Sequence, residues 1–239
     1  MPSFQKRSDQ KELLDRPDIP FDAIRKNMQE LDVINRYLGG HAITLAGLEE
    51  VTQKCSVARP LRITEIGCGG GDNLRAIKRW AQRKGRAVRL CGIDLNPECI
   101  RFAREQPENE GIEFQQSDYR DVSFGSLPDV LFSSLFCHHF SDEELVFMLR
   151  WMQDHSKTGF FINDLHRHPV AYYSIKGLTQ LFSGSYLVKN DAPLSVQRGF
   201  TRKEWTAILQ KAGISRLKVH WRWAFRWLLT YTHADGTGI

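Results

Sequence analysis

The sequence predicts an α/β fold in which helices cover both faces of a mostly parallel sheet. From residue 61 onward, short β-branched segments alternate with segments whose apolar residues recur at helical spacing. This is the pattern of parallel strands joined by helical crossovers. The first strand runs into a loop with four glycines in five positions. The 239 residues are 41% hydrophobic and 26% charged, as expected of one large globular domain with a sizeable core.

Two predicted helices, Phe21–Leu38 and His41–Gln53, precede this alternation. Apolar residues follow one another at spacings of three and four in both, which indicates one buried face. Because they come before the first strand they are not crossovers, and we expect them to cap or flank the edge of the sheet that holds a ligand. We therefore divide the chain into a helical cap, residues 1–58, and a main domain, residues 59–239. We expect the polar residues 1–17 to be frayed or loosely docked.

The alternation itself supplies five strands and three helices. The predicted strands are Leu61–Ile66, Ala87–Ile93, Ile112–Gln115, Val130–Ser133 and Gly159–Ile162. The predicted helices are Asn73–Arg83, Pro97–Glu105 and Ser141–His155. Ser141 and Glu144 have the spacing of a capping box, which fixes the start of the third helix.

A long segment, His166–Arg198, then breaks the alternation. It is rich in aromatic and aliphatic residues, and an insertion at the carboxyl end of a strand lies over the ligand site of such a sheet. We interpret it as a helical lid, with a plain structural insertion as the alternative. A helix, Lys203–Ala212, and two strands, Ile214–His220 and Trp221–Leu229, complete a seven-stranded sheet. The last strand alternates aromatic and basic residues, and we favour packing beside the core over contact with nucleic acid.

The glycine loop decides the class of ligand. Its pattern is Glu65-x-Gly67-x-Gly69-x-Gly71. A dinucleotide fingerprint would need glycine where Asp72 stands, and the Gly-Lys-Ser/Thr ending of a P-loop is absent. The pattern resembles the first motif of class I S-adenosylmethionine (SAM) dependent methyltransferases.

Two further acidic residues agree with a SAM site. Asp94 ends the second strand about 20 residues beyond the glycine loop, where a carboxylate binds ribose in the related dinucleotide fold. Asp118, in Ser117-Asp118-Tyr119 after the third strand, is placed to accept from the adenine amino group. We expect cofactor contacts from Glu65, Gly67, Cys68, Gly69, Gly71, Asn73, Asp94, Leu95, Ser117, Asp118, Tyr119, Ser134 and Leu135.

Residues 61–165 therefore resemble a Rossmann-like class I methyltransferase domain. Motifs at 35–41, 136–140, 163–169, 191–195 and 198–201 extend the resemblance. They point to a bacterial small-molecule subgroup similar to type III polyketide synthase-associated O-methyltransferases and ubiquinone/menaquinone-biosynthesis methyltransferases. This resemblance implies methyl transfer from SAM to a hydroxyl of a hydrophobic phenolic or polyketide-like molecule. The alternatives are C-methylation of a quinol-like ring, an RNA methyltransferase and a SAM-binding protein without transfer activity.

A hydroxyl acceptor must lose its proton, and histidine is the usual general base near neutral pH. We rank His166 first, because it opens the inserted segment, and His139 second. A structural role remains the alternative for each histidine. We expect the substrate to contact His138, Arg167, Tyr172 and Tyr173.

The sequence disfavours several classes of protein and of binding site. The Asn/Asp-Pro-Pro-Tyr/Phe motif of adenine and glutamine methyltransferases is absent after the fourth strand, and no carboxylate cluster has metal-ligand spacing, so we expect no metal. The five cysteines form no C-x-x-C pair, which favours reduced thiols and a cytoplasmic protein. We expect no signal peptide and no integral membrane segment. The net charge of +5 is spread along the chain, so we do not expect a nucleic-acid partner.

Overall fold

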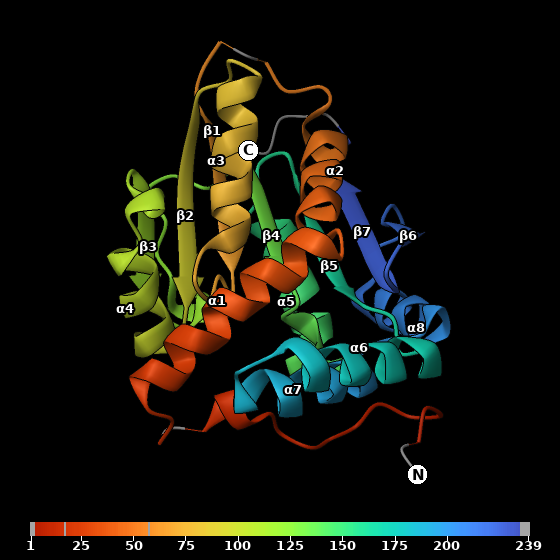
Figure 1. Cartoon of the computed structure of the whole chain (residues 1–239). Coiled ribbons are helices and arrows are strands. Elements are labelled where there is room, and N and C mark those ends of the chain that lie inside the picture. Colours follow the sequence, from red (N-terminus) through yellow and green to blue (C-terminus); the bar gives the residue numbers. More distant parts are fainter. Residues whose placement is uncertain (1–2, 17, 57, 235–239) are drawn as a thin grey trace.

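The computed structural model describes residues 3–16, 18–56 and 58–234. Its centre is a seven-stranded sheet in the order β3-β2-β1-β4-β5-β7-β6 (Figure 1). The strands are β1 Leu61–Ile66, β2 Val88–Asp94, β3 Ile112–Gln116, β4 Val130–Ser134, β5 Gly159–Leu165, β6 Lys218–Arg222 and β7 Arg226–Thr232. The first five pair in parallel, whereas β7 is antiparallel to both β5 and β6. The predicted mostly parallel, Rossmann-like sheet is confirmed.

Helices cover both faces of this sheet. α2 Gly40–Thr52 and α3 Asp72–Arg83 lie on one face, and α5 Asp142–Asp154 and α8 Arg202–Ala212 lie on the other (Figure 1). α4 Pro97–Glu105 packs beside β2 and β3. A separate hydrophobic cluster fills the space on each face. Because the central strands are covered twice, they consist almost wholly of buried residues.

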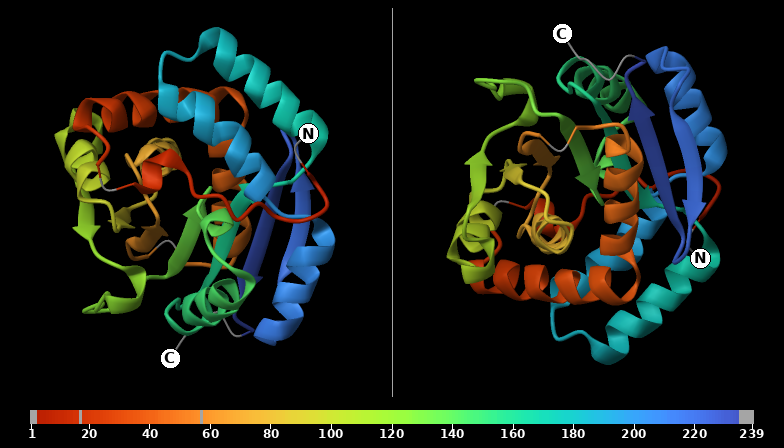
Figure 2. Two further views of the ribbon diagram at one scale, coloured as in Figure 1. Left: turned by 90° about the horizontal axis from the view of Figure 1, so that it is seen from below. Right: turned by 90° about the horizontal axis from the view of Figure 1, so that it is seen from above.

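The remaining elements gather where the parallel strands end. α1 Phe21–Tyr37, α6 Pro169–Phe182 and α7 Tyr186–Arg198 surround this carboxyl edge, and the N-terminal segment crosses it (Figure 2, left). α6 and α7 pack on each other, and α7 also touches α1, β5 and the short helix η1, Leu13–Asp15. The helical insertion after the fifth strand is therefore confirmed. α2 packs on β5 and β7, and the division of the chain at residue 58 stays a prediction.

Of the two alternatives for the N-terminal residues, docking holds, and the prediction for the last two strands is wrong. Residues 3–16 are docked rather than frayed: Arg7 donates to the carbonyl oxygens of His138 and Phe140, and Glu12 is buried. At the other end, the last hairpin turns inside the Trp- and Arg-rich stretch, at Ala224 and Phe225, which have φ of 59° and 55°. The predicted strands Ile214–His220 and Trp221–Leu229 are thus displaced, because the aromatic stretch forms the turn and its two flanks.

No helix among the described residues is long and apolar enough to cross a membrane.

Candidate active site

The glycine loop joins β1 to α3 at the carboxyl edge. Gly67, Gly69 and Gly71 all have positive φ, at 69°, 48° and 77°, a conformation that side chains other than glycine disfavour. A Cβ added at Gly67 would also overlap the ring of Phe136, which follows β4. The loop therefore has no room for side chains, and its backbone lies directly beside the end of β4.

Glu65 is the next-to-last residue of β1, and one of its carboxylate oxygens takes part in a hydrogen bond. The side chain is buried, and its Oε1 accepts a hydrogen bond of 3.1 Å from Nδ2 of Asn73. Its Oε2 has no partner among the described residues. Burial, followed by the charge of Asp72, raises the pKa of Glu65 well above its ordinary value. A buried acceptor without a partner is costly, so this oxygen fits a ligand that brings an ammonium group or another donor.

Asp94 connects the end of β2 to the glycine loop. Its two oxygens accept from the backbone N–H groups of Gly69 (2.8 Å) and Asn96 (2.9 Å). Burial raises the pKa of Asp94 although these hydrogen bonds oppose the rise. The following residue, Leu95, is exposed at the same edge. The carboxylate thus has the position that a ribose-binding group needs.

The residues that follow β3 lie partly at the carboxyl edge of the sheet and partly in the core. Asp118 accepts from the side chain of Arg120 and from its backbone N–H, and these bonds lower the pKa of the carboxyl group. Ser117 donates to the carbonyl oxygen of Asp118. Tyr119 instead points into the core, where its ring packs edge-on against Trp151 at 5.1 Å between centroids. Ser117 and Asp118 therefore remain at the edge, and Tyr119 does not.

Three other predicted contacts also differ in orientation. Cys68 is buried on Gly92 and faces the core. Ser134, at the end of β4, accepts from Nδ2 of Asn163. Leu135 has a φ of 53°, which is strained for a leucine. The strained residue comes directly before Phe136, so it helps to turn the chain over the glycine loop.

The motif at 35–41 holds the start of α3. His41 Nε2 lies 2.8 Å from Oδ2 of Asp72, and Nδ2 of Asn35 donates to the same oxygen at 2.9 Å. Burial would raise the pKa of Asp72, but His41 and Asn35 keep it below its ordinary value. The α1–α2 junction is thus bonded to the glycine loop.

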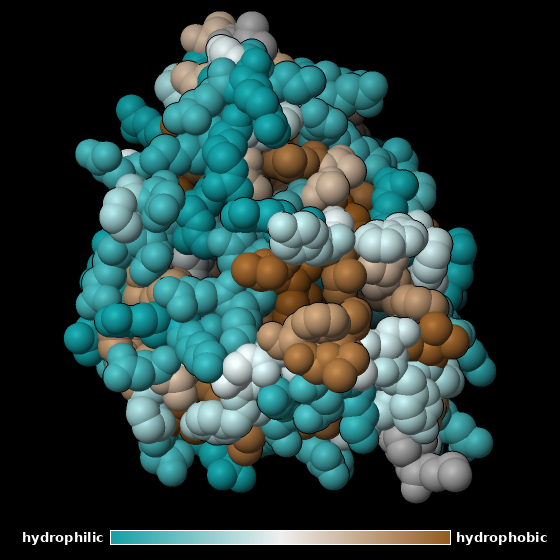
Figure 3. Space-filling view, in the orientation of Figure 1, coloured by the Kyte–Doolittle hydropathy of each residue, from teal (hydrophilic) through white to brown (hydrophobic). Residues whose placement is uncertain are grey.

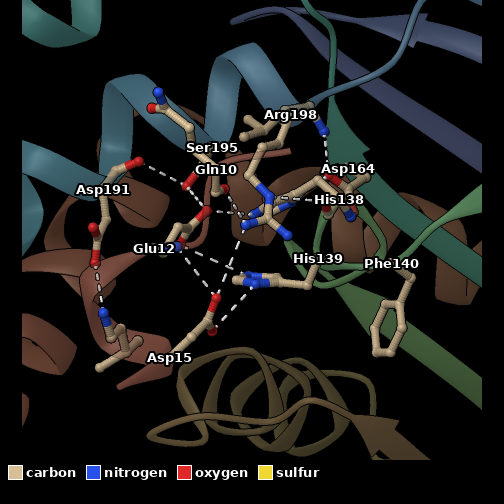
Figure 4. A network of polar contacts seen from close by, with 12 residues as sticks. Gln10, Glu12, Asp15, His138, His139, Phe140, Asp164, Asp191, Ser195 and Arg198 are labelled. Carbon is tan, nitrogen blue, oxygen red and sulfur yellow. Dashed lines mark hydrogen bonds and ion pairs between the residues drawn. The ribbon is translucent and has the colours of Figure 1, made fainter. Parts of the chain in front are cut away.

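A second polar network surrounds the two histidines after β4 (Figure 4). His138 is buried, with Nδ1 at 2.8 Å from Oδ1 of Asp164 and Nε2 at 3.4 Å from Oε1 of Glu12. Burial alone would lower the pKa of His138, but the two carboxylates raise it to about 9. His138 is therefore a buried cation at neutral pH, which suits it to hold the N-terminal segment rather than to accept a proton.

His139 lies in the same network but is partly exposed. Its Nε2 lies 3.8 Å from Glu12, and its Nδ1 lies 3.4 Å from Asp15 (Figure 4). Its ring centroid also lies 6.4 Å from that of Phe136, the ring that a Cβ at Gly67 would overlap. His139 thus lies beside both the N-terminal carboxylates and the residue that packs on the glycine loop.

His166 faces another direction. Its ring packs against Trp227 and Phe225, and its Nδ1 accepts from Nε1 of Trp221 at 3.2 Å. Burial, followed by the charges of His168 and Arg167, lowers the pKa of His166. The neutral ring therefore carries its proton on Nε2, because its Nδ1 lone pair is already used.

The remaining predicted substrate contacts lie around α6. Arg167 donates to the carbonyl oxygens of Phe4 and Gly199 and to Glu204 at 2.6 Å, so its guanidinium is occupied. Tyr172 and Tyr173 pack against each other and against Phe4 of the N-terminal segment. None of these contacts brings Arg167, Tyr172 or Tyr173 to the glycine loop.

Sequence reasoning missed Glu12 and Asp15 because a polar N-terminus carries no local signal of burial. Their ligand atoms, with those of His138 and His139, form a compact cluster; those of Glu12, His138 and His139 lie within 4.8 Å of one another. The expectation of a metal-free protein stays a prediction.

The comparisons with known proteins agree with this arrangement. The sequence model of a family described as "Methyltransferase domain" matches residues 63–159, which span β1 to the start of β5 and include the glycine loop, Asp94 and Asp118. Residues 63–159 are therefore similar to a methyltransferase domain. The polar groups that could hold a cofactor in this region lie at the carboxyl ends of β1, β2 and β3.

Two curated relatives are similar over part of this chain. A fatty-acid O-methyltransferase of Mycolicibacterium smegmatis is 31% identical over 108 residues, which are 45% of this chain and 34% of that protein. A ubiquinone biosynthesis O-methyltransferase of Aeromonas salmonicida is 27% identical over 155 residues, which are 62% of this chain and 60% of that protein. The chain thus spans between a third and three fifths of the length of these relatives.

Solved structures share the fold over most of the chain. The plantazolicin methyltransferase BpumL in complex with SAH has a TM-score of 0.61 at 22% identity, covering 87% of this chain and 75% of that one. Human N-acetylserotonin methyltransferase in complex with SAM has a TM-score of 0.60 at 18% identity, covering 88% of this chain and 56% of that one. At these identities the likeness shows the fold alone.

Proposed function

We propose that this protein is a SAM-dependent methyltransferase, and that it transfers a methyl group from SAM to a hydroxyl of a hydrophobic, phenolic or polyketide-like small molecule. The observation that carries the proposal is the meeting, at one edge of the sheet, of the glycine loop with an imidazole held between carboxylates. The unused oxygen of Glu65 suits the amino group of SAM, and Asp94 suits its ribose. Two curated relatives are named O-methyltransferases, which supports oxygen as the acceptor atom, whereas a third, of Methanocaldococcus jannaschii, is named a putative protein N5-glutamine methyltransferase.

His139 is the better placed base. When bound, SAM would supply a methyl group whose carbon is attacked in line by the acceptor oxygen, with the sulfur of SAH as the leaving group, so the chain has to position that oxygen and take its proton. His139 is partly exposed beside the cofactor groups, and Glu12 and Asp15 would stabilise the imidazolium ion that forms. His166, our first choice from sequence, has its Nδ1 lone pair occupied by Trp221, and becomes the second candidate.

The surface supports an apolar acceptor. Hydrophobic side chains gather around α6 on the face shown in Figure 3. Val170, Leu178, Leu181 and Phe182 of α6 are all exposed. An apolar ligand that enters between α6 and α1 would cover part of this surface, which otherwise remains in water at a cost.

The test uses SAM labelled in its methyl group and a panel of alkylphenols, pyrones and quinols. We expect a labelled product whose mass increases by one methyl group and whose label is lost on cleavage of an aryl methyl ether. Label that resists ether cleavage would indicate C-methylation of the ring instead. Transfer to RNA but to none of the small molecules, with loss of transfer at high salt, would contradict the proposal.

A further inference from the structure

Arg226 is a buried cation with almost no partners. It opens β7, pairs with Leu165 in the register of β5, and is 3% exposed. Of its five N–H donors, one makes a hydrogen bond in the described structure, from Nη2 to Oδ1 of Asn35 at 3.0 Å. Its Nη1 is buried without a partner among the described residues, and none of the ion pairs described above includes Arg226.

The other buried arginines behave differently. Arg75 donates to Gly70 and Asn109 and pairs with Asp32 at 2.9 Å. Arg167 donates to two carbonyl oxygens and pairs with Glu204 at 2.6 Å. Arg198 likewise donates to two carbonyl oxygens and lies 3.9 Å from Asp15. Because an unpaired buried charge is expensive, the isolation of Arg226 calls for a negatively charged partner that comes from outside the chain.

The location of Arg226 places that partner in the ligand site. Asn35, which binds Arg226, also donates to Asp72 at the glycine loop. Asn163 of β5, whose side chain is on the α2 side with Gly40 and Thr44, likewise has a buried oxygen without a partner. The carboxylates that act on Arg226 through their charge are Asp164 and Asp72, but both are hydrogen-bonded to histidines. Among the described residues, neither carboxylate forms an ion pair with Arg226.

We propose that the Arg226 guanidinium binds a carboxylate group of a ligand at this edge of the sheet. Planar guanidinium and carboxylate groups match in shape and form paired hydrogen bonds. The carboxylate comes from one of two sources: the amino-acid end of SAM or an acidic acceptor substrate. If the carboxylate belongs to SAM, the proposal requires only that the chain binds SAM. If it belongs to an acceptor substrate, the proposal also rests on the proposed function. The experiment has one arm for each source.

The first arm measures binding of SAM and of decarboxylated SAM by calorimetry, with the wild-type chain and Arg226→Met. If the cofactor supplies the carboxylate, the substitution weakens SAM binding at least tenfold and leaves decarboxylated SAM unaffected. This arm requires no turnover, so it is valid even if the proposed hydroxyl methylation fails.

The second arm measures binding of 4-hydroxycinnamate and its primary amide in the presence of SAH. If the substrate supplies the carboxylate, Arg226→Met weakens binding of the acid at least tenfold and leaves the amide and SAM unaffected. The proposal would be overturned if Arg226→Met left the affinity for all four ligands unchanged. It would also be overturned if the substitution weakened SAM and decarboxylated SAM equally, and the acid and its amide equally.

The melting temperatures of the variants show whether a loss of binding comes from a loss of folding. Arg226→Met should unfold at the wild-type temperature or above it, because it removes an unpaired buried charge. Arg75→Met should unfold several degrees lower, because Asp32 and the side-chain oxygen of Asn109 each lose the hydrogen-bond donor that Arg75 supplies. A melting temperature of Arg226→Met as low as that of Arg75→Met would show a structural role and would contradict the proposal. If Arg226→Met does not fold, Arg226→Gln is used in both binding arms.

Discussion

At the scale of single residues, what a polar side chain can bind depends on the hydrogen bonds that it already makes within the chain. Arg167, predicted to contact an anionic substrate, is occupied by Phe4, Gly199 and Glu204. Arg226 lies in a stretch that the sequence marked only as aromatic and basic, and its guanidinium is nearly unused. Residue type and spacing predicted which groups lie at the edge of the sheet. They could not predict which are free, because that depends on contacts between segments far apart in the chain.

The two candidate bases can be separated by substitution. His139→Ala should lower the rate of methyl transfer by about 10²–10⁴-fold, the usual contribution of a general base, and should leave SAH affinity unchanged. His166→Ala should lower it by less than about tenfold, because the ring nitrogen that lacks a proton already accepts from Trp221. Steady-state kinetics and calorimetry on both variants test this. A larger loss in His166→Ala than in His139→Ala would reverse the assignment.

At the scale of elements, the sequence predicted those whose signals are local. The strands up to β5 and the capping box at Ser141 were predicted from nearby residues, and the box forms. The last hairpin was misplaced because aromatic and basic residues at Trp221–Trp227 suit a strand as well as a turn, and only the pairing with β5 fixes the register. The N-terminal segment was missed because its binding site consists of α7 and the loop after β4, which are far away in the sequence.

The docking of that segment should depend on pH through His138. The folded-state pKa of His138 is about 9, above its ordinary value of 6.5. The resulting stabilisation is therefore complete below about pH 6.5 and is lost as the pH rises through 9. A shift of this size corresponds to at most about 3 kcal/mol. Denaturant unfolding at pH 6.5 and pH 9.5 should show a fall in the free energy of unfolding of that order.

His138→Asn should remove most of this pH dependence, whereas His220→Gln, on β6, should retain it. If His138→Asn is too unstable to measure, Glu12→Gln removes one of the two carboxylate partners and should reduce the slope. An identical pH dependence in the wild type and in the variant at Glu12 or His138 would show that this pair does not stabilise the fold.

At the scale of the whole molecule, the carboxyl edge of the sheet is closed by parts drawn from the entire chain. Residues 3–16, α1, α6 and α7 meet there, although they lie up to about two hundred positions apart (Figure 2). Such an enclosure can exclude water from a reacting methyl group, and it must open to admit ligands. A ligand that binds the closed form would stabilise the whole chain by mass action.

The most direct test is a calorimetric titration of the wild-type chain with SAH. We expect one site per chain with a dissociation constant below about 100 µM, in the range usual for enzyme ligands. Asp94→Ala should weaken the binding at least about tenfold, because a hydrogen bond to a charged group contributes about 1.5–3 kcal/mol. No heat of binding with the wild type, or equal affinity in the Asp94 variant, would contradict a SAM site at the carboxyl edge of this sheet.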